Sequence, residues 1–265
     1  GVCKTISPHP LSRMESKVLR NADAVVCISE TLRNEAISRG VSSERILVVP
    51  NAVSHDASDS EEPELLSEVK MKLGQSPVVG YIGSLRELEG VDFTASAVAE
   101  LRTRGIDAKL FVLSTESGQS ELIAHCETLG IADHVHIVGP VPHEQVSHFY
   151  ELIDVFVVSR PDTRVTRLVT PLKPFEAMYH ARPLVMSNLP ALAEIIDEGR
   201  TGLLYPPGDL SVLVDSIEKI LTDKEFAKRL GNAAKNWIIS ERTWSNVCSE
   251  YIEAYALAKN NSRGE

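Results

Sequence analysis

The sequence predicts an α/β fold in which a Rossmann-like, doubly wound parallel sheet forms the core. Short β-branched apolar runs alternate with amphipathic stretches along nearly the whole chain. The apolar runs lack the in-and-out alternation of a strand with one solvated face, so they are typical of parallel strands covered by helices on both faces. Repeated strand–helix alternation is the pattern of doubly wound domains.

Seven apolar runs are predicted as strands, at residues 24–28, 46–49, 78–82, 110–113, 135–138, 155–158 and 184–186. A helix is predicted from its N-cap Ser29 to a stop at Gly40, and a second follows Asp209. A third is expected to begin at a capping box formed by Thr222 and Glu225.

The end of the chain is predicted to form a closing helix from Trp244 to Ala258. One face of this helix needs cover because it carries apolar and aromatic side chains, namely Val247, Tyr251, Ala254, Tyr255 and Ala258.

An acidic, polar segment at residues 54–64 is predicted as an exposed linker. We therefore expect three parts in the chain. Residues 1–55 hold the end of one domain and a linker, 56–240 a complete α/β domain, and 241–265 the closing helix and tail.

Composition excludes several classes of function. The formal net charge of −10 disfavours nucleic-acid binding, because a phosphate backbone would be repelled. The four cysteines show no C-x-x-C pair or zinc spacing, so we expect no metal, free thiols and a cytoplasmic location. No apolar run approaches the roughly 18 residues that cross a bilayer. No basic amphipathic helix supports membrane association either.

A basic cluster stands against this acidic background between residues 160 and 182. It holds five basic and two acidic residues, a local charge of +3, and follows the strand that ends near Val158. Ligands of open α/β sheets bind at the carboxyl ends of strands, and Arg and Lys beside a helix N-terminus suit a diphosphate. The alternative is a solvated charged loop, which composition alone favours. The basic members are Arg160, Arg164, Arg167, Lys173 and Arg182.

Three further positions allow two interpretations each. Gly80 and Gly83 form a G-x-x-G turn rather than a dinucleotide fingerprint, and spacing alone favours a tight turn over a phosphate loop. Glu176 lies on an otherwise apolar helix, so its carboxylate needs partners. Ribose hydroxyls would serve, but an ion pair with Lys173 is the simpler account. Glu194 is either a surface residue or part of the same cleft.

Read together, the segments of the chain resemble glycosyltransferase family 4, whose members have the GT-B fold of two Rossmann-like domains. Residues 21–30 and 50–53 resemble the end of the family's first domain. The second domain is matched in order by Gly83–Asp92, Gly139–His143, Thr170–Met178 with Pro183–Ser187, and Thr201–Asp209.

The resemblance implies transfer of a hexose from a nucleoside-diphosphate sugar to a hydroxyl acceptor, a glycan or lipid-linked sugar, with retention and without a cofactor. It places Glu176 on the ribose hydroxyls, Gly83 and Ser84 near the diphosphate, Val141 at the base and Glu194 beside the cleft. Thr170 belongs to the same donor-binding motif.

The chain departs from the family at the charged positions. Leu168 stands where the first of two paired glutamates belongs, and Ser84 and Glu89 replace the Arg/Lys pair that grips the diphosphate. We therefore hypothesise that Lys173, together with Arg164 or Arg160, neutralises the diphosphate, with Lys173 and Arg164 as the catalytic residues. An epimerase of the same fold and a non-catalytic nucleotide-binding or interaction module remain alternatives.

The resemblance also implies that residues 1 to about 53 match only the end of the first domain. The chain is then expected to lack most of the acceptor-binding half, including its catalytic histidine, and to be inactive alone. His9 lies too near the linker to be that histidine. The missing domain is accordingly an expected partner.

Overall fold

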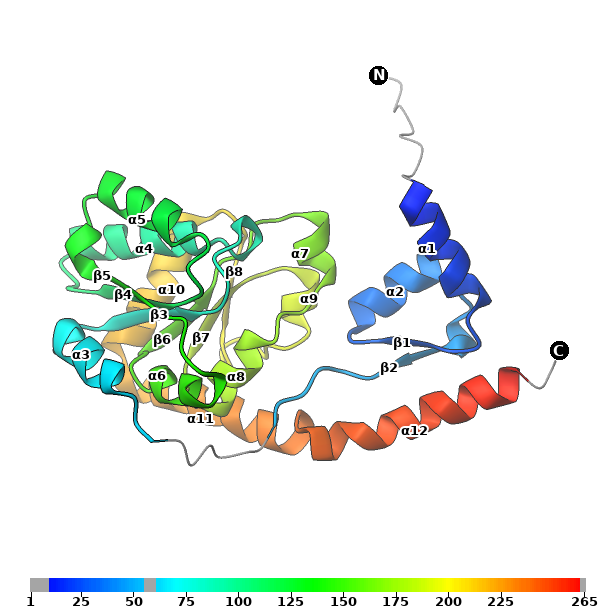
Figure 1. The fold of residues 1–265 in the computed structure, drawn as a ribbon. Helices are drawn as coiled ribbons and strands as arrows, with labels where there is room; N and C mark the ends of the chain where they lie inside the picture. Colours follow the sequence, from blue (N-terminus) through cyan, green and yellow to red (C-terminus); the bar gives the residue numbers. More distant parts are fainter. Residues whose placement is uncertain (1–9, 55–60, 263–265) are drawn as a thin grey trace, which may run out of the picture. The chain divides into compact units, whose positions relative to one another are not determined.

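The computed structural model describes residues 10–54 and 61–262, which form two compact units (Figure 1). The larger unit extends from Ala52 to Trp244. The smaller unit combines the chain up to Asn51 with the segment from Ser245 onward. Each unit is described by itself below.

The larger unit is built on a six-stranded sheet in which every pairing is parallel. The strands lie in the order β5-β4-β3-β6-β7-β8, so the first strand of the unit is central and the sheet grows outward in both directions from it. This is the Rossmann order, and its reversal point lies between β3 and β6. The strands are β3 (Val78–Ile82), β4 (Lys109–Leu113), β5 (Val135–Val138), β6 (Val155–Val158), β7 (Leu184–Ser187) and β8 (Leu203–Tyr205).

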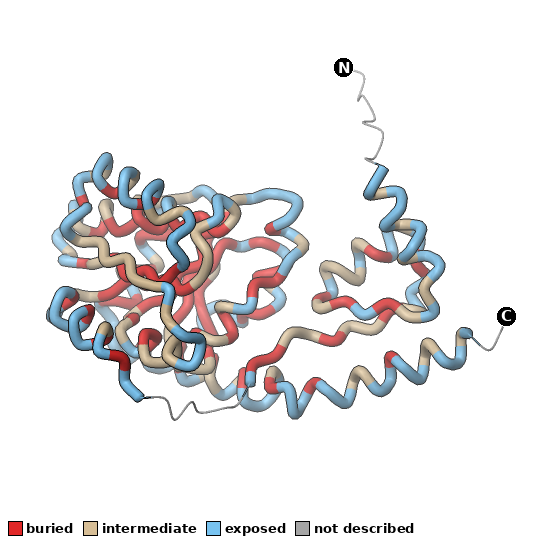
Figure 2. Tube along the Cα trace, viewed as in Figure 1, coloured by how far each residue is buried: buried red, intermediate tan, exposed pale blue. Residues whose placement is uncertain are grey.

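Helices cover both faces of this sheet (Figure 1). One face carries α4 (Val91–Thr103), α5 (Gln119–Thr128) and α10 (Leu210–Thr222). The other carries α3 (Glu64–Leu73), α6 (Val146–Tyr150), α8 (Lys173–Tyr179) and α11 (Lys224–Glu241). Every residue of β3, β6 and β7 is buried, which confirms the prediction made from their apolar runs (Figure 2). Two short helices, α7 (Arg164–Leu168) and α9 (Pro190–Ala193), follow β6 and β7.

The smaller unit contains a two-stranded parallel sheet, β1 (Val25–Cys27) with β2 (Ile46–Val48). Its helices are α1 (Pro10–Asn21), α2 (Glu30–Ser38) and most of α12 (Trp244–Asn261). The Ser29 hydroxyl accepts the Leu32 N–H at 3.1 Å, so Ser29 is the N-cap of α2 as predicted. The alternation of elements in the sequence predicts a helix before β1, and α1 is that helix. None of the helices in the described parts of the chain has the length and apolar character needed to span a membrane.

All seven predicted strands are present, and the structure adds β8, which lies between Gly202 and Pro206 and was not predicted. The predicted capping box of α11 is wrong. The N-cap is Asp223, whose carboxylate accepts the Phe226 N–H at 2.9 Å, while Thr222 ends α10 and donates its hydroxyl proton to the Glu218 carbonyl. Most of the predicted linker at 54–64 lies outside the described residues.

The closing helix α12 forms, and most of its predicted face is covered. Val247 and Ala254, seven residues apart, are buried. Tyr255, which was expected to need cover, is 75% exposed. Tyr251 and Ala258 are partly buried, so the predicted face is wrong only at Tyr255.

The loops that follow β3 and β6 touch at the reversal point of the sheet. Gly90, at the N-cap of α4, adopts a left-handed conformation with φ 66°. A Cβ at this position would lie 2.0 Å from the carbonyl oxygen of Ser159, so no other residue fits. The Ser159 hydroxyl donates to the Gly90 carbonyl at 2.5 Å and lies 2.6 Å from the Thr94 hydroxyl.

We predict that Gly90→Ala lowers the free energy of unfolding by about 2–5 kcal/mol, the sum of left-handed strain and overpacking. Gly130→Ala is the matched control, because Gly130 also has a positive φ of 71° but no atom within 4 Å of the position that a Cβ would take. It should cost only the backbone term of roughly 1–2 kcal/mol. Equal losses in urea unfolding would show that the contact with Ser159 is not tight.

Candidate functional site

The candidate site lies at the carboxyl edge of the sheet, where the connections that follow the paired strands β3 and β6 pass to opposite faces. Two glycines allow close approach there. A Cβ on Gly83 would lie 2.7 Å from the Tyr81 hydroxyl, which donates to the Ser84 carbonyl at 3.2 Å. A Cβ on Gly139 would lie 2.4 Å from the Ser114 carbonyl. Both turns can therefore lie this close to their neighbours only because glycine has no side chain.

Some polar groups at this edge have hydrogen-bond partners within the protein, and one buried hydroxyl has none. The Gly83 N–H donates to the Leu113 carbonyl at 3.0 Å, which ties the turn after β3 to β4. Val141, in the turn after β5, is half-buried and packs against the core of the unit. The Ser114 hydroxyl is buried and has no hydrogen-bond partner among the described residues. Buried hydroxyls are normally paired, so this one is a candidate to meet a bound molecule.

Arg160 lies at the end of β6 and is buried, with 5% of its surface exposed. Its Nε and Nη2 donate to the two carboxylate oxygens of Glu89 at 3.0 and 2.9 Å, and Nη1 donates to the Val169 carbonyl at 3.0 Å. Glu89 is equally buried, at 6% exposed. Arg160 was predicted to bind the donor, but its guanidinium forms a bidentate ion pair with Glu89 and a hydrogen bond to a main-chain carbonyl within the protein. The ion pair links the turn after β3 to the loop after β6.

Lys173 and Glu176 lie together on the first turn of α8. The lysine Nζ is 3.0 Å from Oε1 and 2.9 Å from Oε2 of Glu176. Both side chains are partly accessible, at 31% and 27% exposed. Oε2 also accepts a hydrogen bond from the Tyr150 hydroxyl at 2.9 Å. The ion pair that the spacing predicted is therefore present, on a carboxylate that a ligand can still reach.

Two further members of the basic cluster, Arg164 and Arg167, lie on short helix α7. Arg164 is its first residue and is exposed. Arg167 is exposed and bonds both oxygens of Asp162, and this contact lowers the pKa of that carboxyl. Thr170, predicted to bind the donor, is buried, and its hydroxyl donates to the Ala191 carbonyl at 3.3 Å. Arg182, the last member of the cluster, donates to the carbonyls of His180 at 2.8 Å and Ile153 at 3.2 Å.

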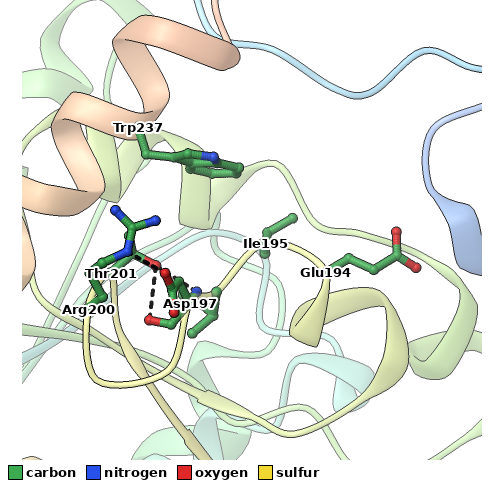
Figure 3. A pocket seen from close by; sticks show the side chains of 7 residues that line it. Glu194, Ile195, Asp197, Arg200, Thr201 and Trp237 are labelled. Carbon is green, nitrogen blue, oxygen red and sulfur yellow. Dashed lines mark hydrogen bonds and ion pairs between the residues drawn. The ribbon is translucent and has the colours of Figure 1, made fainter.

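Glu194 lines a pocket of about 140 Å³ between the segment after α9 and Trp237 of α11 (Figure 3). Asp197 and Arg200 form an ion pair in this pocket. The Glu194 side chain points away from Trp237, and neither Lys173 nor Glu176 lines the pocket.

Two residues that contact the predicted site residues were not predicted to do so from the sequence. Tyr150 reaches Glu176 across 26 residues, and Glu89 reaches Arg160 across 71. A tyrosine shortly before a buried strand and an acidic residue at a cation position were the available signals. In residues 10–54 and 61–262, no three His, Cys, Asp or Glu side chains gather into a group that could hold a metal ion.

We predict that Glu89→Ala lowers the free energy of unfolding by about 3–5 kcal/mol, because it leaves the Arg160 charge buried without a counter-ion. Arg167→Ala is the control, since it breaks an exposed pair and should leave stability close to that of the parent chain. Equal stability of the two variants in denaturant unfolding would contradict a structural role for the Glu89–Arg160 pair.

Comparison with known proteins agrees with this architecture. The sequence profile of the family Glycosyl transferases group 1 matches residues 64–237, and that of Glycosyltransferase Family 4 matches residues 5–57. An alpha-D-kanosaminyltransferase of Streptomyces kanamyceticus is 26% identical over 223 residues, which cover 83% of this chain and 56% of that protein. The chain spans little more than half the length of this relative.

Two solved structures share the fold. A sucrose-phosphate synthase from Thermosynechococcus elongatus superposes with a TM-score of 0.78 at 22% identity, over 97% of this chain and 63% of that one. Anabaena Alr3699/HepE, solved in complex with UDP and glucose, gives a TM-score of 0.78 at 18% identity, over 96% and 70% of the two chains. The architecture is that of GT-B glycosyltransferases. With a profile that matches more than half of its length, the chain belongs to the glycosyl transferases group 1 family.

Proposed function

We propose that this chain supplies the nucleotide-sugar-binding domain of a glycosyltransferase. The reaction is transfer of a hexose from a nucleoside-diphosphate sugar to a hydroxyl acceptor, with retention at the anomeric carbon. The acceptor, a glycan or a lipid-linked sugar, is bound by a further domain. The donor is the only small molecule that the domain needs, and no cofactor takes part.

The observation that carries this proposal is the Lys173–Glu176 pair on the first turn of α8, beside the loop after β6. An ammonium and a carboxylate match the two polar parts of a nucleoside diphosphate. The ammonium suits the diphosphate, and the carboxylate accepts hydrogen bonds from ribose hydroxyls. The location also agrees with the general rule that ligands of such sheets bind at the reversal point.

Binding requires the pair to exchange partners. Without ligand, Lys173 neutralises Glu176. A diphosphate offers the ammonium more negative charge than one carboxylate does, and the four-carbon stem of lysine can turn toward it. Glu176 then keeps its oxygens for the ribose. The exchange costs little, because a partly exposed ion pair contributes little stability.

Charge at the leaving group comes from Lys173 and Arg164. Negative charge develops on the departing diphosphate as the bond to the sugar breaks, and fixed cations near it stabilise the transition state. Arg160 does not add to this charge because Glu89 neutralises it. Its place in the proposal is to hold the two loops in register, while Ser84 and Val141 contact the diphosphate and the base through the turns after β3 and β5.

The compared proteins support the class of ligand. The kanosaminyltransferase is a sugar transferase by its name, and the Anabaena protein was solved with UDP and glucose. A sugar donor for the present chain follows by analogy. Leu168, at the end of α7, makes the sugar side of the site less polar, which disfavours the epimerase alternative.

We predict that the chain binds one of UDP, GDP or ADP most tightly in a calorimetric titration. Lys173→Ala should weaken that affinity roughly tenfold or more, because a charge-assisted contact with the diphosphate is lost. Glu176→Ala should weaken it as well, through the ribose.

Lys224→Ala serves as the matched control, since Lys224 also pairs with a carboxylate, that of Asp154, in the same unit. It should leave the affinity unchanged. Unchanged affinity in Lys173→Ala would contradict the diphosphate role, and a folded chain that binds none of the three nucleotides would contradict the proposal.

A further inference from the structure

Tyr150 is a buried tyrosine whose hydroxyl contacts Glu176. It is the last residue of α6 and is 1% exposed. Its hydroxyl donates to Glu176 Oε2 at 2.9 Å. Burial, together with the charge of Glu176, raises the pKa of Tyr150 well above its ordinary value, so the phenol remains a hydrogen-bond donor at any working pH.

The ring of Tyr150 is fixed by its neighbours. It stacks on the His180 imidazole with 4.8 Å between centroids and 8° between planes. It also packs against Phe156 of β6 at 5.9 Å. Burial, with nearby Arg182 and Lys235, lowers the pKa of His180 to about 4, so the imidazole is a neutral stacking partner at neutral pH. The hydroxyl therefore has a single position relative to α8.

Helix α8 and the residue that ends it present three side chains along one face toward this arrangement. Lys173, Glu176 and His180 are spaced by three and four residues, the spacing at which helical side chains are neighbours. His180 anchors the tyrosine ring, Glu176 accepts its hydrogen bond, and Lys173 pairs with the carboxylate from the start of the helix. Glu176 thus lies between one fixed donor and one mobile donor.

We propose that Tyr150 is a positioning residue for ribose recognition. It holds Oε2 of Glu176 in place when Lys173 turns to the diphosphate, which leaves Oε1 directed at the ribose hydroxyls. The inference rests on the proposed function, since it takes Glu176 as the ribose ligand. A carboxylate accepts about four hydrogen bonds, so one from Tyr150 leaves room for both ribose hydroxyls.

The consequence separates this role from simple packing. Without the phenol, the carboxylate has no fixed partner once Lys173 has moved, and it can take several rotamers. Fixing the Glu176 carboxylate in one rotamer then costs free energy, and this cost lowers the affinity only for ligands that have ribose hydroxyls. Affinity for the ribonucleotide should fall, whereas affinity for an analogue without the hydroxyls should not.

The test uses the whole 265-residue chain and the nucleoside diphosphate that it binds most tightly, beside the 2′,3′-dideoxy form of that nucleotide. The readout is the Kd of the dideoxy form divided by the Kd of the ribonucleotide, both measured by calorimetry. It is determined for the parent chain and for Tyr150→Phe, Glu176→Ala and Tyr205→Phe. Phenylalanine keeps the ring and its stack on His180. Tyr205 is the matched control, because it is fully buried on β8 and hydrogen-bonds Ser187 rather than a carboxylate.

We expect Tyr150→Phe to reduce this ratio roughly fivefold, the cost of ordering one side chain on binding, while Tyr205→Phe leaves it unchanged. Melting temperatures measured in parallel report any loss of packing separately. A parent-like ratio in Tyr150→Phe, with the ratio lost in Glu176→Ala, would overturn the inference and leave the proposed function standing. An unchanged ratio in Glu176→Ala, or no binding by the folded parent chain, would overturn both.

Discussion

The parallel pairing of β3 with β6 is the constraint on which the rest of the larger unit depends. Val79 and Gly80 pair with Val155 and Phe156, and Gly80 is required because a Cβ there would lie 2.3 Å from the Ile153 side chain. At this pair the connections pass from one face of the sheet to the other, so the loops at the carboxyl edge diverge. The Gly90–Ser159 contact and the Glu89–Arg160 pair then fix the two loops against each other. These contacts hold the two loops in one arrangement at the carboxyl edge of the sheet.

The cations of the basic cluster fall into two groups: those paired with carboxylates in the protein and those proposed to bind a ligand. The basic cluster has an excess of cations in sequence, but Glu89 lies outside that window and neutralises Arg160, while Asp162 binds Arg167. The cations proposed to meet a ligand are Arg164, at the start of α7, and Lys173, whose carboxylate partner is proposed to bind the same ligand. A buried pair such as Glu89–Arg160 adds little net stability over an apolar pair, yet loss of one partner leaves a stranded charge. The Glu89–Arg160 pair therefore serves to fix the geometry of the two loops rather than to add net stability.

Much of the fold could be predicted from the sequence, because buried parallel strands follow from local apolar runs and the N-cap of α2 from a local serine. The Lys173–Glu176 pair was predictable for the same reason, since its partners lie on one helical turn. The failures are of two kinds. Competing local caps misplaced the start of α11, where Asp223 rather than Thr222 bonds the helix. Long-range pairing could not be predicted: the sequence marks Glu89 and Tyr150 as unusual at their own positions, but it does not indicate that they meet Arg160 and Glu176. Such pairs exist only once the sheet has brought distant segments together.

The central claim is that the edge of the sheet between β3 and β6 is a nucleotide site with Glu176 as the ribose ligand. A crystal structure of the chain with its preferred nucleoside diphosphate tests this most directly. The account predicts ribose hydroxyls on Glu176, the Tyr150–Glu176 hydrogen bond unchanged, and Lys173 turned from the carboxylate to the diphosphate. A nucleotide bound elsewhere, for instance in the pocket beside Trp237, or one bound here with Lys173 still on Glu176, would contradict it.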